Sequence, residues 1–209
     1  VSEQEVRQYV ADLLISYAMK AKTKNDIIVF ARSCTTNWRT KYFIHYNTKQ
    51  KKSDDKKDLV VKVIDEMINL LGEYYPFNSH RHIYCNSEDV IASIVRESSA
   101  TEKITIVSSN PRLHQLCQFP TISIFDPLKG EMLKMNTKEA EDYLRTLIIT
   151  GDRDLCVPNV FSDDDTCVSG KRNKSITSTA MRDMLLLNQP NFMSSLQNAG
   201  FGKHLERNN

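Results

Sequence analysis

Two short segments of the sequence place carboxylates where they could bind a divalent cation. Glu88 and Asp89 are adjacent and lie at an expected junction between a strand and a helix, whereas Asp152 and Asp154 lie in a loop after another expected helix. Carboxylate oxygens are the ligands that Mg²⁺ prefers, and a bound metal could activate water for hydrolysis. The alternative is structural, because acids also stabilise the first turn of a helix or lie in solvent.

The segment from Ile106 to Leu116 is the most informative part of the chain. It predicts a short buried strand, a turn and the start of a helix, and the turn carries Asn110 and Arg112. A neutral amide and a cation would be poor ligands for a divalent metal ion.

Cations alternate with aromatic rings between residues 38 and 52. This pattern suits phosphate contacts and base stacking, but it equally suits a solvated helix face whose aromatic rings lie in the core. A second basic run, at 171–174, precedes the helix expected at 176–187 and could bind phosphate with the help of the N-terminus of that helix. A solvent-exposed surface loop would account for this basic run equally well. The candidate nucleic-acid-binding residues are Arg39, Lys41, Tyr46, Lys49, Lys51, Lys171, Arg172 and Lys174.

Length and composition suit a globular protein of one domain, or of one domain and a small appendage. The chain has 209 residues and a formal net charge of +2, which by itself does not imply a nucleic-acid partner. The five scattered cysteines predict reduced thiols in a cytoplasmic protein rather than a zinc site. No apolar run approaches the length of a membrane span, and no signal peptide is visible. Because the chain starts at Val1 and directly in a helix, a preceding segment could be missing.

The elements that would position these residues alternate between helix and strand. Apolar periodicity predicts helices at 3–21, 59–71, 88–96, 138–149 and 176–187, a short helix around 113–117, and strands at 27–31, 82–85, 103–107 and 121–125. Gly72 and Ser87 are expected to cap helices. This order predicts an α/β fold with a parallel sheet between helices, in which 27–31 is a central strand. Ligands of such sheets bind at the carboxyl ends of the strands.

The order and spacing of these pieces resemble the flap-endonuclease-like 5′-nucleases, most closely the T-even bacteriophage ribonuclease H type. The likeness runs from about residue 3 to residue 187, and its specific parts are 27–30, 38–39, Tyr46, 88–92, 106–109, 115–116, 151–152, 157–160 and 175–179. It implies a PIN-like α/β domain at 1–150, followed at 151–209 by a helical, helix-hairpin-helix-like module that binds DNA.

The resemblance also implies a ring of carboxylates that holds Mg²⁺ for hydrolysis of 5′ ends or flaps in DNA or RNA–DNA duplexes. The sequence departs from this ring at four acid positions, which are occupied by Arg32, Asn86, Asn110 and Arg112. The acids that survive, and that would bind metal, are Glu88, Asp89, Asp152 and, one residue displaced, Asp154. Asp89 and Asp152 would be catalytic if the protein is active.

We therefore expect a catalytically impaired 5′-nuclease fold that binds duplex or 5′-flap nucleic acid, within a phage replication or transcription assembly in the host-cell cytoplasm. A cation about 4 Å from a divalent metal costs several kcal/mol even at an effective dielectric constant of about 20, so no cofactor is expected. One alternative is an active, divergent Mg²⁺-dependent 5′–3′ exonuclease or flap endonuclease. Another is a protein-interaction module without nucleic-acid contact.

Overall fold

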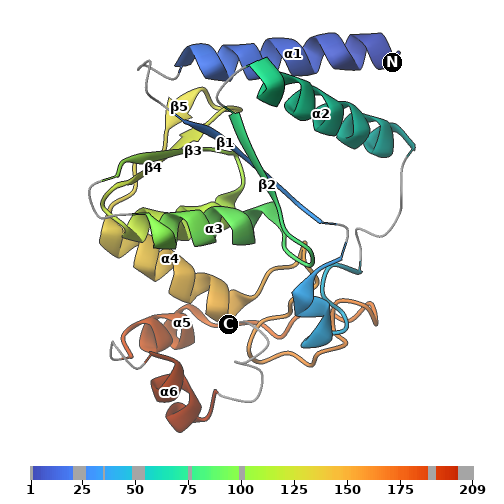
Figure 1. The fold of residues 1–209 in the computed structure, drawn as a ribbon. Coiled ribbons are helices and arrows are strands. Elements are labelled where there is room, and N and C mark those ends of the chain that lie inside the picture. Colours follow the sequence, from blue (N-terminus) through green and yellow to red (C-terminus); the bar gives the residue numbers. More distant parts are fainter. Residues whose placement is uncertain are drawn as a thin grey trace. The chain divides into compact units, whose positions relative to one another are not determined.

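The structure is a computed structural model that describes residues 2–20, 27–34, 36–48, 55–74, 77–98, 102–187 and 192–201. The chain divides into two compact units. The first comprises Val1–Asn37 and Lys52–Ile91, and the second comprises Trp38–Lys51 and Ala92–Asn209. Helices and strands occur in both, as Figure 1 shows.

The first unit consists of two long helices and a pair of strands. The elements are α1 (Glu3–Lys20), β1 (Ile28–Arg32), α2 (Asp55–Tyr74) and β2 (Phe77–Arg81). Helices α1 and α2 lie side by side (Figure 1), because Val6, Val10 and Leu14 form one apolar face of α1 and pack with the fully buried Val63 of α2. The helix predicted at 3–21 is confirmed, and the helix predicted at 59–71 extends further at both ends.

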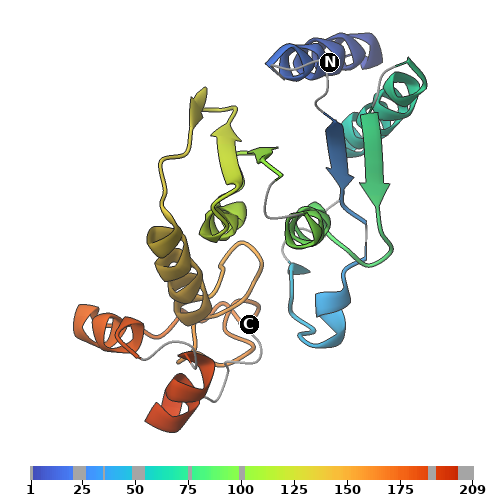
Figure 2. The ribbon, with the colours of Figure 1, turned by 60° about the vertical axis from the view of Figure 1, so that its left-hand side comes forward.

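Strands β1 and β2 are parallel, and their register pairs Ile28 with Phe77 and Arg32 with Arg81. Figure 2 shows the two strands running side by side in the same direction. Among the residues that the structure describes, β1 pairs with β2 alone, so the prediction of a central strand was wrong. The two arginines lie side by side at the carboxyl ends of the strands.

Two local predictions in the first unit were wrong. The strand expected at 82–85 lies instead at Phe77–Arg81, and the expected strand residues form a turn in which Tyr84 has a φ of 66°. Pairing with β1 makes a strand of a polar sequence that has little β propensity of its own. Gly72 lies within α2 and does not end it, since the helix continues to Tyr74.

Helix α3 (Ser87–Glu97) begins in the first unit and ends in the second. Its cap is Asn86, whose carbonyl accepts from the N–H groups of Asp89 and Val90, and the Asp89 carboxylate in turn accepts from the Asn86 N–H at 2.9 Å. The prediction that Ser87 is the cap was therefore wrong by one residue. Asp89 has a structural role at this helix start.

The second unit combines a mixed sheet with helices. Its elements are η1 (Trp38–Lys41), β3 (Ile104–Val107), η3 (Pro111–Gln118), β4 (Ile122–Asp126), β5 (Glu131–Met132), α4 (Thr137–Thr150), α5 (Ser178–Leu185), α6 (Phe192–Leu196) and η4 (Gln197–Phe201). Strands β3 and β4 are parallel, and β5 is antiparallel to β4. The predicted strands and helices in this part of the chain are confirmed, with the helix at 176–187 shortened to α5.

Helices α4, α5 and α6 share one apolar cluster. It contains Ile148 and Ile149 of α4, Met184 of α5, and Phe192 and Leu196 of α6. The segment after residue 150 thus packs on the helix before it, and the expected boundary at 150 runs through this cluster. A separate DNA-binding module at 151–209 stays a prediction.

All five cysteines are free thiols. Within the described ranges, none of the helices combines the length and the apolar character that a membrane crossing needs.

Candidate functional site

The guanidinium of Arg112 binds the carboxylate of Asp152 through two hydrogen bonds. Arg112 Nε donates to Oδ2 of Asp152 at 2.5 Å, and Nη2 donates to Oδ1 at 3.1 Å. Both side chains are about three-quarters buried. Paired N–H donors in a planar fork match a carboxylate closely, and this makes such a pair stronger and more specific than one made by lysine.

A tight loop presents Asp152 to Arg112. Gly151 ends α4 with a φ of 67°, and Asp152 then pairs with Val157 in an antiparallel bridge of two 2.8 Å hydrogen bonds. Inside the loop, Oδ1 of Asp152 also accepts from the backbone N–H groups of Asp154 at 2.9 Å and Leu155 at 3.1 Å. A short polar side chain that bonds its own backbone two and three residues onward is typical of such turns.

The pair remains charged in the folded protein. Burial raises the pKa of Asp152, but the hydrogen bonds and charge of Arg112, together with the N–H groups of Leu155 and Asp154, outweigh burial and leave this pKa below its ordinary value. The nearby Tyr143 of α4 responds to the same group, because burial and the Asp152 charge raise the pKa of its hydroxyl. Asp152 is therefore an ionised carboxylate whose charge Arg112 compensates.

The residues around Asp152 do not fit a divalent metal. Both of its oxygens already accept hydrogen bonds from Arg112. Asp154, the expected substitute ligand, is 87% exposed and its Oδ2 lies 4.0 Å from Nη2 of the same arginine. No group of three or more metal-binding side chains occurs within the part of the chain that is described. A guanidinium thus lies where a metal would need an open carboxylate oxygen.

Asn110 has a structural role beside this pair. Its side chain accepts from the Arg112 N–H at 3.0 Å and caps η3, and Pro111 occupies the first position of that helix. Asn110 N–H in turn donates to Ser108 Oγ at 3.1 Å. Asn110 therefore bonds directly to the backbone of Arg112 at the start of η3.

The other predicted acids, Glu88 and Asp89, lie in the first unit at the start of α3. Asp89 accepts the Asn86 N–H described above, and Oε2 of Glu88 accepts from Ser87 Oγ at 3.2 Å. Both acids are partly buried. The candidate ligands are divided between the two units, with Asp152 and Asp154 in the second.

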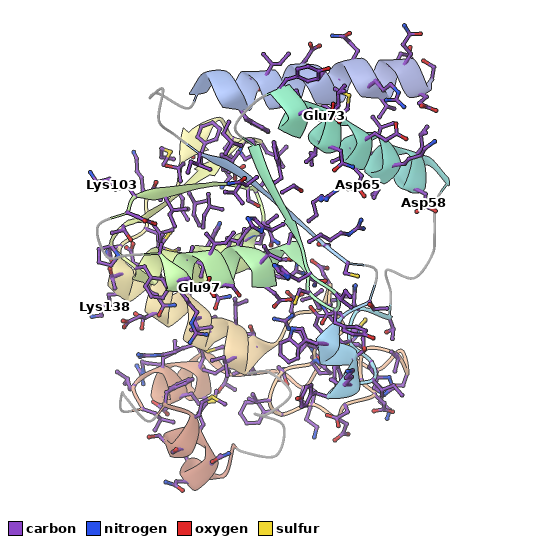
Figure 3. The ribbon with its side chains drawn as sticks, viewed as in Figure 1. Asp58, Asp65, Glu73, Glu97, Lys103 and Lys138 are labelled. Atoms are coloured by element: carbon purple, nitrogen blue, oxygen red, sulfur yellow. The ribbon has the colours of Figure 1, made fainter. Side chains whose placement is uncertain are left out.

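Arg32, the fourth position at which the resemblance led us to expect an acid, is bound by a carboxylate that the sequence analysis did not identify. Its Nη1 donates to Asp65 Oδ1 at 3.1 Å, and Nη1 of Arg81 donates to Oδ2 of the same residue at 3.0 Å. Figure 3 shows Asp65 on α2, on the side toward the strands. Arg81 also donates to the carbonyl of Ser33 at 3.2 Å. One aspartate thus ties α2 to the ends of both strands.

Two signals could have identified this cluster. Asp65 lies three residues before the buried Ile68, so it falls near the buried side of an amphipathic helix. Arg81 would have paired with Arg32 if the second strand had been placed at 77–81 rather than at 82–85.

The basic and aromatic segment at residues 38–52 contains both buried and exposed aromatic rings. Tyr46 is 5% exposed and packs with Phe43 and Val157, so its ring lies in the core, as the structural alternative expects; a role in nucleic-acid binding stays a prediction. Arg39 lies over the rings of Trp38, at 4.5 Å, and Tyr46, at 5.8 Å. Lys41 is exposed. Lys49 and Lys51 lie outside the described residues.

The second basic run lies on an ordered loop. Lys171 Nζ donates to Asp165 Oδ2 at 3.0 Å, and this bond and charge, with burial opposing them, hold the pKa of Asp165 below its ordinary value. Asn159 donates to the Lys174 carbonyl at 2.6 Å, and the Lys174 N–H donates to Ser162 Oγ at 2.8 Å. The side chains of Lys171, Arg172 and Lys174 are exposed.

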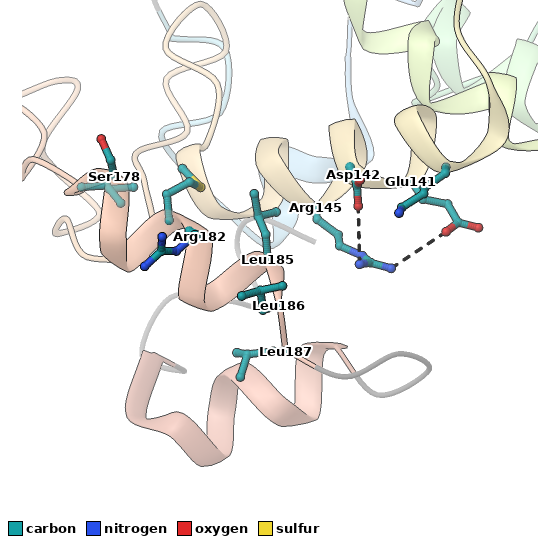
Figure 4. Close-up of a pocket in the computed structure, with 11 residues that line it drawn as sticks. Glu141, Asp142, Arg145, Ser178, Arg182, Leu185, Leu186 and Leu187 are labelled. Atoms are coloured by element: carbon teal, nitrogen blue, oxygen red, sulfur yellow. Dashed lines mark ion pairs between the residues drawn. The ribbon is translucent and has the colours of Figure 1, made fainter.

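A pocket of about 930 Å³ lies elsewhere in the second unit, between α4 and α5 (Figure 4). Leu185 and Leu187 contribute apolar lining, and Arg145 faces Glu141 at 4.0 Å and Asp142 at 3.7 Å. None of the predicted site residues lines it. This pocket is therefore separate from the Arg112–Asp152 pair.

Comparison with known proteins identifies the fold. No protein-family model matches the chain, and neither does any curated protein. The chain is similar to bacteriophage T5 5′-exonuclease with bound divalent metal ions (zinc), at 14% identity and a TM-score of 0.62, over 97% of this chain and 79% of that one.

A second similar structure is a pseudo-enzyme–product complex of bacteriophage T5 flap endonuclease with DNA and metal ions, in which lysine replaces one aspartate. Here the identity is 15% and the TM-score 0.59, over 97% of this chain and 78% of that one. The chain thus has the α/β fold of the flap-endonuclease-like 5′-nucleases, with parallel strands and flanking helices, as the sequence resemblance implied.

Proposed function

We propose that the protein binds nucleic acid through a 5′-nuclease fold that has lost metal-dependent cutting. The observation that carries this proposal is the two-bond pairing of Arg112 with Asp152. A neutral side chain in place of the arginine would leave the carboxylate available to a metal. The guanidinium occupies its oxygens and also repels a divalent ion.

The free-energy cost of displacing Arg112 from Asp152 supports the proposed loss of nuclease activity. A metal ion at Asp152 would have to break two charge-assisted hydrogen bonds in a partly buried place. It would also leave a guanidinium nearby without its carboxylate partner, and an unpaired buried charge is strongly unfavourable. Under this proposal Asp89 and Asp152 stabilise the fold and take no part in hydrolysis.

Two observations support the binding role. The T5 pseudo-enzyme described above carries a lysine in place of an aspartate, and its structure is nevertheless a complex with DNA and metal ions. In this chain, cations gather on two segments: the first carries the partly buried Arg39 and the exposed Lys41, and the second carries the exposed Lys171, Arg172 and Lys174. Exposed lysine and arginine side chains supply the phosphate contacts that dominate nucleic-acid affinity. A place in a phage replication or transcription assembly remains part of the proposal, and the similar structures are phage proteins.

Nuclease and binding assays with the same preparation test the proposal. The purified protein is incubated with labelled 5′-flap and nicked duplexes in Mg²⁺ or Mn²⁺, and binding to the same substrates is measured by fluorescence anisotropy. We expect binding without product formation, and no heat from a calorimetric titration with Mn²⁺.

Product formation that disappears in Asp89→Ala or Asp152→Ala would overturn the proposal in favour of an active, divergent nuclease. Absence of binding to every nucleic acid would favour a protein-interaction module instead. Arg153→Met serves as the control, since Arg153 is an exposed cation on the Asp152 loop and contributes nothing to the Arg112 pair.

A further inference from the structure

A buried arginine lines the pocket between α4 and α5. Arg145 is 9% exposed, and its guanidinium lies 5.5 Å from the centre of the Phe192 ring. The two carboxylates paired with it belong to its own helix: Oδ1 of Asp142 lies 3.7 Å from Nη1, and Oε2 of Glu141 lies 4.0 Å from Nη2. Both separations exceed the length of a hydrogen bond. Arg145 thus makes ion pairs but no hydrogen bond with the residues that the structure describes.

A ligand in the pocket could supply the missing acceptors. A guanidinium carries five N–H donors, and leaving such donors without acceptors in a buried place is costly. In Figure 4, Arg145 lies between its two acidic partners and the leucines at the end of α5. A carboxylate is the group that matches the planar fork of an arginine with two parallel hydrogen bonds. The chemistry of Arg145 therefore indicates a carboxylate as the polar part of the ligand.

Apolar side chains form another part of the lining. Met181, Leu185 and Leu187 pack against the buried cluster of α4, α5 and α6, whereas Leu186 is 76% exposed. The cavity volume of about 930 Å³ lies within the range of small-molecule sites, which are mostly apolar and carry few polar groups. An apolar chain in this pocket would cover these side chains, and the removal of apolar surface from water would favour binding.

The charges of the lining favour a ligand with one negative charge. Lys138, Arg145 and Arg182 are cations, whereas Glu141 and Asp142 are anions. Three positive charges against two negative ones leave a surplus of one positive charge. A monoanion balances this surplus, whereas a cation adds to it.

We propose that the pocket between α4 and α5 binds a small apolar monocarboxylate, such as a fatty acid of medium chain length. Its carboxylate pairs with Arg145, and its chain lies against Leu185 and Leu186. This site goes beyond the proposed binding of nucleic acid and does not depend on it, since neither Arg112 nor Asp152 lines the pocket.

Calorimetric titration of the full chain with three probes tests both parts of the ligand. The probes are decanoate, decylammonium, which has the same chain with the opposite charge, and butyrate, which has the same charge with a short chain. Each is used below the concentration at which it forms micelles. We expect decanoate to bind at one site and the other two probes to bind about ten-fold more weakly or less, the order of one lost charge-assisted contact.

Two matched substitutions of exposed leucines locate the binding site. Leu186→Asp places a carboxylate in the pocket and removes an apolar contact, so decanoate binding should weaken about ten-fold. Leu128→Asp is the control, because Leu128 is 85% exposed in the same unit but does not line the pocket. This variant should bind decanoate as the wild type does. Thermal denaturation checks that both variants are folded, which their exposed positions favour.

Arg145→Met tests the polar anchor. This variant should lose the preference for decanoate over decylammonium, because the chain can still bind but the guanidinium is gone. Because Arg145 is buried, its variant could fold poorly; in that case the leucine pair and the three probes decide the outcome.

Three results would overturn the proposal. One is equal affinity of the wild type for decanoate and decylammonium, and another is unchanged decanoate binding in Leu186→Asp. The third is an equal loss in Leu186→Asp and Leu128→Asp, which would indicate adsorption over the whole surface. None of them bears on the nucleic-acid binding measured by anisotropy, so failure of this site and failure of the proposed function are distinguishable.

Discussion

Arg112 and Asp152 form a two-bond ion pair in the second unit. Their two hydrogen bonds join η3 to the loop after α4 and compensate the charge of a carboxylate that is about three-quarters buried. Under the proposed function, this carboxylate is a structural contact rather than a metal ligand. Arg32 is used in the same way, since it binds Asp65 of α2.

Replacing Arg112 should therefore destabilise the fold in a pH-dependent way. We expect Arg112→Met to lower the free energy of unfolding by about 2 kcal/mol at neutral pH, the order of hydrogen bonds to a charged group. The folded pKa of Asp152 lies below 3.8, its ordinary value. Its contribution is then complete above that pH and is lost as the pH falls through the folded pKa.

Urea denaturation of both proteins over a range of pH checks this prediction. The difference between wild type and Arg112→Met should shrink as the pH falls below 3.8. Arg153→Met should show no such difference at any pH. A constant difference would mean that the arginine acts through packing of its aliphatic part rather than through its charge.

At the scale of elements, the junction between α4 and the Asp152 loop has no room for a side chain at residue 151. Gly151 has a φ of 67°, and a Cβ there would lie 2.3 Å from the carbonyl oxygen of Val157 and 2.4 Å from that of Pro158. Both neighbours are backbone atoms, so a side-chain rotation cannot make room. The glycine thus allows α4 to end where Asp152 meets Arg112.

Gly151→Ala should lower the free energy of unfolding by about 3 kcal/mol or more, because backbone strain and steric overlap add. Gly130 offers a matched control, since it also has a positive φ, of 72°, but nothing lies within 4 Å of an added Cβ. Gly130→Ala should cost about 1 kcal/mol. Equal losses in chemical denaturation would show that the close approach at Gly151 relaxes easily.

At the scale of the whole molecule, the net charge is small, so the positions of the cations matter more for binding nucleic acid than the net charge does. The formal net charge is +2, yet cations gather on two segments of the second unit, at Arg39 and Lys41 of η1 and at Lys171–Lys174. Lys171 is paired with Asp165, whereas neighbouring Arg172 makes no ion pair with any residue that the structure describes. A cation already paired with a carboxylate has less to gain from a phosphate.

The salt dependence of DNA binding should distinguish these two residues. Each phosphate contact adds about 0.7 to 0.9 to the slope of log affinity against log salt concentration. We expect Arg172→Ala to reduce the slope by about one contact and Lys171→Ala to reduce it less. Anisotropy titrations at several salt concentrations measure both slopes. Identical slopes for wild type and Arg172→Ala would exclude this loop from the binding surface.

The order of helices and strands follows from local patterns in the amino-acid sequence. Spacing of apolar residues indicates α1, α2, α3 and α4, and β-branched runs indicate β1, β3 and β4, because these signals depend on neighbours within one or two turns. The resemblance to the 5′-nucleases also predicts, from the sequence alone, that Arg32, Asn86, Asn110 and Arg112 stand at acid positions. From them follows the expectation that a metal site is impaired.

Which carboxylates these arginines pair with could be identified only in the folded structure. Arg112 and Asp152 are 40 residues apart, and Arg32 and Asp65 are 33 apart, so no local pattern pairs them. The polar strand β2 exists because β1 supplies its hydrogen bonds, and this tertiary pairing overrides its weak propensity. Tertiary packing likewise buries Tyr46 and leaves Tyr42 exposed, although both belong to one basic and aromatic segment.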